Sequence, residues 1–143
     1  MLLNVSYNNK EITQKIDSEV GKPYSLKERI QLGGIGSPRL VITETSIQIY
    51  NLLILDNNRN VCNIEMRPEG IIVGFRSLLE SYALIIPYYK LSLYKSKAEE
   101  YSIHRDNYFI KIEAKAKDKS VHRFMNKLLE AKAQVSPPRI EDL

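Results

Sequence analysis

From Arg39 onwards, the apolar residues of this chain change their spacing once, near Ala114. From Arg39 to Ala114 they form short runs of Ile, Val, Leu, Tyr and Phe, separated by turn residues at roughly 8 to 12 positions, which is typical of antiparallel β-structure. After Ala114 the spacing becomes helical, with apolar residues at Val121, Phe124, Met125, Leu128 and Leu129. We therefore expect a mainly β fold that ends in one amphipathic helix.

Candidate strands in the β-rich part are separated by residues that favour turns. Arg67-Pro68-Glu69-Gly70 has proline and glycine where a type I turn favours them, and Asp106-Asn107 tolerates left-handed backbone. Asp56 to Asn60 is a third predicted turn. About seven strands are expected in the barrel, and the candidate centres are Val41, Leu52, Ile64, Val73, Leu84, Leu93, Ile103 and Ile110.

The chain divides into three parts by composition. Residues 1–36 form an N-terminal extension with a short strand, a helix carrying Ile12, Ile16 and Val20, and helical turns starting at the capping box Ser25 to Glu28. We expect this extension to pack on a domain formed by residues 37–135. Pro137-Pro138 prevents the last helix from continuing, so residues 136–143 form a short tail.

The segment Ile86-Pro87-Tyr88-Tyr89-Lys90-Leu91, the hairpin from Tyr101 to Ile112 and the helix containing Phe124 to Leu129 together resemble the bacterial pleckstrin-homology-like (PH-like) domains. The resemblance covers roughly Arg39 to Gln134. It implies a bent, partly open barrel capped by the C-terminal helix, and a binding or scaffolding module without catalysis. Some members bind phosphoinositides through a basic loop, but the corresponding loop here, Asp56 to Asn60, carries a single arginine, so that activity does not transfer.

Few residues are placed for catalysis or metal binding. One cysteine, Cys62, and two histidines, His104 and His122, do not give the clustered spacing of a metal site, and no cofactor is expected. The glycine-rich stretch from Gly33 to Ser37 lacks the Gly-Lys-Ser/Thr of a phosphate-binding loop. We therefore expect no enzymatic activity and interpret Cys62 as a buried core residue.

Positive charge is concentrated in one segment. The chain carries 21 basic and 17 acidic residues, and the excess of four lies between Lys111 and Lys132. Three interpretations remain open: a solvated helix face, attraction to an anionic membrane surface, and nucleic-acid binding, which lacks a stacking platform. The segment Lys111 to Lys127 would provide an anion-binding surface, with candidate residues Lys115, Lys117, Lys119 and Arg123.

Tyrosine is the dominant aromatic residue, with nine copies against three phenylalanines. Tyrosine packs well in sheets and also suits contact surfaces. Because Tyr88 and Tyr89 are adjacent, one of them is expected to be exposed. We select Tyr88, Tyr89 and Tyr94 as candidate partner-binding residues.

No segment of the sequence has the features of a secretory signal or is long enough to span a bilayer. A cytoplasmic location is therefore expected. The leading hypothesis is a non-enzymatic PH-like module that binds a protein partner or associates with itself. The alternative is peripheral binding to anionic phospholipid through Lys111 to Lys127.

Overall fold

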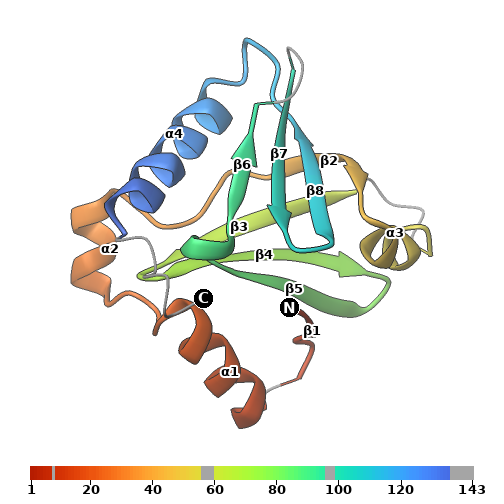
Figure 1. Cartoon of the computed structure of the whole chain (residues 1–143), viewed down its shortest axis with the longest axis horizontal. Coiled ribbons are helices and arrows are strands. Elements are labelled where there is room, and N and C mark those ends of the chain that lie inside the picture. The colour runs from red at the N-terminus through yellow and green to blue at the C-terminus, as the bar shows by residue number, and fades with distance from the viewer. Residues whose placement is uncertain (8, 56–59, 96–98, 136–143) are drawn as a thin grey trace.

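The computed structural model describes residues 1–7, 9–55, 60–95 and 99–135, and its main feature is one antiparallel sheet of eight strands (Figure 1). The strand order is β1-β5-β4-β3-β2-β8-β7-β6. The elements are β1 (Leu2–Asn4), α1 (Lys10–Val20), α2 (Leu26–Leu32), β2 (Leu40–Thr45), α3 (Ile47–Leu53), β3 (Val61–Arg67), β4 (Gly70–Ser77), β5 (Glu80–Pro87), η1 (Tyr88–Lys90), β6 (Ser92–Tyr94), β7 (Glu100–Arg105), β8 (Tyr108–Glu113) and α4 (Lys119–Gln134).

Strand β2 joins the two halves of the sheet. Its first residues, Leu40 and Val41, pair with β3, whereas Ile42 to Thr45 pair with β8. A register shift between Ile42 and Glu44 marks the change of partner, and such irregularities bend a strand. The β6-β7-β8 half consequently runs across the β3-β4-β5 half (Figure 1). Within the described residues the sheet stays open, since β1 and β6 end the order and do not pair with each other.

The core lies between the two halves of the sheet and α4. Alternate residues of the strands face it, so that Ile64, Val73 and Ile110 are almost fully buried. The predicted apolar face of α4 packs against them through Val121, Phe124, Met125 and Leu128. The expectation of a mainly β fold ending in one amphipathic helix is confirmed, and the helix starts after Asp118. Leu129, placed on the same stripe from the sequence, is 42% exposed.

The strand predicted around Leu52 is wrong, because this segment forms helix α3. Ile49 and Leu53 are buried and lie four residues apart, which puts them on the same face of a helix. A short apolar run satisfies both strand and helix patterns. Here the burial of these two side chains on one face favoured the helix, since the Ser46 side chain bonds to Phe109 and does not cap it.

The other predicted strand centres all lie in strands. The hairpins at Pro68-Glu69 and Asp106-Asn107 form as expected, and Asp106 adopts a positive φ of 52°. The described residues form eight strands, of which β2 to β8 lie within residues 37–135 and β1 lies in the N-terminal extension, where a short strand was predicted. Most of the predicted turn at 56–60 and the whole tail at 136–143 lie outside the described residues.

The N-terminal extension covers one edge and part of the outer face of the sheet. Strand β1 pairs with β5, and α1 packs against β5 and β4; Figure 1 shows α1 and β1 on the same side of the sheet. Val20 of α1 packs with Ala83 and Ile85 of β5 in a second, smaller core. The capping box predicted at Ser25 is present and starts α2.

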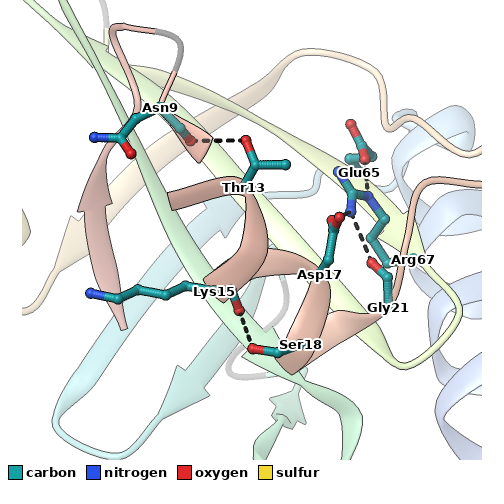
Figure 2. Close-up of polar contacts among 8 residues, drawn as sticks. All are labelled: Asn9, Thr13, Lys15, Asp17, Ser18, Gly21, Glu65 and Arg67. Atoms are coloured by element: carbon teal, nitrogen blue, oxygen red, sulfur yellow. Dashed lines mark hydrogen bonds and ion pairs between the residues drawn. The ribbon is translucent and has the colours of Figure 1, made fainter. Parts of the chain in front are cut away.

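Two buried arginines anchor α1 to the sheet. Arg67 on β3 donates hydrogen bonds to Asp17 and to the carbonyl of Gly21 (Figure 2). Arg105 on β7 pairs with Glu19 at 2.7 Å and also donates to the carbonyl of Ile85. Since the side chains of Arg67 and Arg105 are only 11% and 7% exposed, their positive charges depend on these acceptors.

Replacing Arg105 tests this anchoring. Arg105→Ala removes a buried cation, leaves Glu19 without this ion pair and leaves the Ile85 carbonyl with the Met1 amino group as donor, so the free energy of unfolding should fall by about 2 kcal/mol or more. The exposed Arg123 on α4 provides the matched control, and Arg123→Ala should change it by less than about 0.5 kcal/mol. Urea unfolding followed by circular dichroism measures both. Equal stability of the two variants would contradict the anchoring role.

Candidate functional site

Exposed apolar side chains form a stripe on α3. Ile47, Tyr50 and Ile54 are 63%, 48% and 59% exposed, and their spacing of three and four residues places them on the same side of the helix. The opposite side, with Ile49 and Leu53, faces the core. The solvent side of α3 thus carries exposed apolar side chains beside the polar Gln48 and Asn51, which is unusual for a surface helix.

The turn between β4 and β5 adds two more apolar residues at the same end of the sheet. Leu78 and Leu79 are 58% and 88% exposed, and Ser77, next to them, donates a hydrogen bond to the carbonyl of Leu52 in α3. Figure 1 shows α3 beside the end of β4 and the start of β5. We call the surface formed by Ile47, Tyr50, Ile54, Leu55, Leu78 and Leu79 the apolar end.

Leu78 has a φ of +57°, a left-handed conformation that glycine adopts without strain. A side chain at such a position costs about 1–2 kcal/mol. A bulky, exposed leucine therefore occupies a place where the hairpin alone would favour glycine. Local strain of this kind is common where a residue is retained for contact with another molecule.

The apolar end was not predicted from the sequence. Because the segment around Leu52 was interpreted as a strand, its exposed stripe was not separated from its buried one. The signal was present in the spacing of Ile47, Tyr50 and Ile54, which fits a helix face. Nothing in the sequence, however, indicates that the β4–β5 turn lies next to that helix.

The three candidate tyrosines lie on η1 and β6 and differ in exposure. Tyr88 is 2% exposed, so its side chain is not available for direct contact, and burial raises its pKa. Tyr89 and Tyr94 are both 56% exposed. The exposure of Tyr89 agrees with the expectation that one residue of the adjacent pair Tyr88-Tyr89 is exposed. Tyr94 contacts the ring of His104 edge to face, with centroids 5.3 Å apart.

The basic residues near the start of α4 are mostly exposed. Lys117, Lys119 and Arg123 are exposed and form no ion pair within residues 1–7, 9–55, 60–95 and 99–135. Lys115, by contrast, lies 3.7 Å from Glu113, so part of its charge is balanced. Lys127 reaches away from this group and donates a hydrogen bond to the carbonyl of Gly34.

The cysteine and the two histidines, the side chains best suited to catalysis, are buried or hydrogen-bonded within the fold. Cys62 is buried in the core, and burial raises its pKa to about 12, so the thiol stays protonated and unreactive near neutral pH. The ring of His122 bonds to the Tyr101 hydroxyl at 2.8 Å and to the Lys115 carbonyl at 2.9 Å. His104 bonds to Ser102 at 2.6 Å, and its pKa is lowered by burial and by Lys111.

The glycine-rich stretch has a structural role. Gly33 and Gly34 adopt positive φ values and end α2. The Ser37 hydroxyl accepts a hydrogen bond from the backbone of Ile64 at 2.8 Å. The stretch therefore connects α2 to the sheet.

The described part of the chain has neither a metal-binding cluster nor a membrane-spanning helix. Its residues contain no group of three His, Cys, Asp or Glu side chains that could hold a metal ion. None of its helices has the length and apolarity needed to cross a membrane.

No protein-family model matches the chain, and comparisons with curated proteins and with solved structures found no match. The resemblance to PH-like domains stays a prediction.

Proposed function

We propose that this protein is a non-catalytic binding module of the PH-like type, which contacts a protein partner or a second copy of itself through the apolar end. The observation that carries the proposal is the concentration of exposed apolar side chains on α3 and on the β4–β5 turn, including a strained leucine. Isolated surface leucines need no explanation, but a group of them at one end of a sheet is typical of contact surfaces.

The chain topology supports the PH-like part of the proposal. Strands β2 to β8 are joined through a bent first strand that pairs with both β3 and β8. Helix α4 follows the last strand and packs on the core. This arrangement agrees with the strongly bent, helix-capped barrel that the resemblance implies.

The chemistry of the polar side chains supports a role without catalysis. A catalytic site needs a nucleophile or base with a reachable substrate position. The described candidates are instead engaged within the fold: Glu65 pairs with Arg67, and Glu80 accepts bonds from Asn4 and Ser6. The thiol of Cys62 is buried and protonated.

The contact surface can be tested by making it polar. In a variant with both Tyr50→Ser and Leu79→Ser, two exposed apolar side chains are lost, so the fold should remain stable while partner binding falls at least about tenfold, because each buried apolar side chain contributes ~1.5–3 kcal/mol. Affinity capture with the full chain measures binding to a partner, and analytical ultracentrifugation measures self-association.

Two exposed tyrosines outside the apolar end provide the matched control. Tyr89→Ala and Tyr94→Ala should leave capture and self-association unchanged. If these variants abolish contact while the double serine variant retains it, the tyrosine-bearing elements η1 and β6 form the contact surface instead. A chain that captures no protein and stays monomeric at high concentration would contradict the proposed function.

Leu78→Gly distinguishes an effect of this residue on folding stability from an effect on partner binding. Glycine relieves the strained φ at this position but adds flexibility to the unfolded chain. The free energy of unfolding should therefore change by less than about 1 kcal/mol, while partner binding weakens. Calorimetric unfolding and affinity capture measure the two quantities, and a loss of stability well above that value would show that the leucine serves the fold.

Binding to anionic phospholipid is the second candidate, favoured by Lys117, Lys119 and Arg123, which are exposed and have no ion pair with another described residue. In this case the chain should sediment with phosphatidylserine vesicles at low salt, and changing these three residues to Gln should reduce the bound fraction, since each basic residue contributes about 1 kcal/mol near an acidic surface. Glutamine at Lys10, Lys15 and Lys27 is the matched control. Equal sedimentation of both triple variants would contradict this candidate.

A further inference from the structure

The outer face of β3 and β4 carries an open groove that α1 leaves uncovered. A cavity of about 580 Å³ lies over these strands, and a second depression of about 420 Å³ shares Asn63, Ile72 and Gly74 with it. The N-terminal extension borders the groove at Val5, and the segment from α2 to β2 borders it on the other side. We call this feature the outer groove, lined by Arg39, Val61, Asn63, Ile72, Gly74 and Arg76.

The register of the sheet brings two arginines to this groove. Leu40 pairs with Cys62 and faces the core, so Arg39, just before it, lies on the outer face beside Asn63. Gly74 pairs with Asn63 from the other side, and Arg76 follows two residues later on the same face. From strand spacing, the two arginine Cα atoms are about 12 Å apart.

Neither arginine is neutralised by the fold. Arg67 and Arg105 have carboxylate partners, whereas Arg39 and Arg76 have no ion pair or side-chain hydrogen bond among the residues that the structure describes. Among the described residues that line the groove, Glu65 is the one acidic side chain, and it is paired with Arg67. The groove is therefore positively charged, and guanidinium groups are well shaped to bind carboxylates.

Gly74 lies in the middle of the groove floor. It has no positive φ, and a Cβ added there would come no closer than 3.9 Å to another atom. The fold thus does not require glycine at this position. Glycine also weakens a strand, so the stability of the sheet does not explain its presence. A glycine of this kind is typical of a place where another backbone approaches closely.

The groove has the length of a short extended peptide. Ile72, Gly74 and Arg76 follow one another along β4, and the distance from the first to the third is about 13 Å, enough for four or five extended residues. In such a peptide alternate side chains face the sheet. Carboxylates in alternating positions could therefore reach the arginines while the backbone lies over Gly74.

We propose that the outer groove binds an extended, acidic segment of a partner protein, with its carboxylates on Arg39 and Arg76 and its backbone over Gly74. The inference rests on the proposed function only in that its occupant is a protein. The outer groove would extend the contact surface beyond the apolar end, because Leu78 of the apolar end also lines the groove.

The test uses a fluorescent octapeptide in which glutamate and alanine alternate, with its lysine-containing counterpart as comparison. Fluorescence anisotropy with the full chain should show binding of the acidic peptide alone, weakening as salt rises. Arg39→Ala and Arg76→Ala should each reduce the affinity about tenfold. Gly74→Val should block the groove while the strand, which valine favours, remains folded.

Arg123→Ala is the matched control, since it removes the same charge from an exposed site on α4 and should leave peptide binding unchanged. Circular dichroism verifies that each variant is folded. The proposal is overturned if both peptides bind equally, if the groove variants bind like Arg123→Ala, or if inorganic pyrophosphate binds at the arginines and the acidic peptide does not. Because isolated peptides are used, these outcomes are independent of capture through the apolar end.

Discussion

The structure depends on one strand that belongs to both halves of the sheet. Strand β2 pairs with β3 at Leu40 and with β8 from Ile42 onwards, so the hydrogen bonds of a single strand hold the bend. Because the two halves cross, their inner faces enclose the core, and the remaining opening is covered by α4. The same bend leaves the outer face of β3 and β4 towards solvent. Both the apolar interior and the charged outer groove thus follow from one change of pairing partner.

The N-terminal extension is held on this sheet by ion pairs that fix its position. Its helix α1 buries few apolar residues, with Val20 as its fully buried side chain, and buried charges supply much of its attachment. Arg67 and Arg105 come from different halves of the sheet, and each pairs with an acidic residue of α1. Since a buried ion pair is favourable only when its geometry is satisfied, α1 is fixed in one position. That position leaves the groove beside it open.

The sequence predicted the elements whose signals are local. The helical period from Val121 to Leu128 and the turn residues at Pro68-Glu69 and Asp106-Asn107 were sufficient, because spacing and turn chemistry act over a few residues. Leu52 was assigned wrongly, since a short apolar run does not distinguish a strand from a two-faced helix. The groove could not be predicted, because Arg39 and Arg76 become neighbours only through the register of β2, β3 and β4. Tyr88 looked like a contact residue, but the turn after β5 directs it into the core.

Strand β1 also has a consequence for solubility. It occupies the edge of β5, whose residues Ala83 to Ile86 are all buried and apolar. An edge that includes this apolar stretch, if left bare, would be a template for adding strands from other molecules, as in fibrils. The edge at the other end of the order, β6, is only three residues long, and short edges are poor templates. Pairing with Leu2–Asn4 thereby removes part of the β5 edge from contact with strands of other molecules.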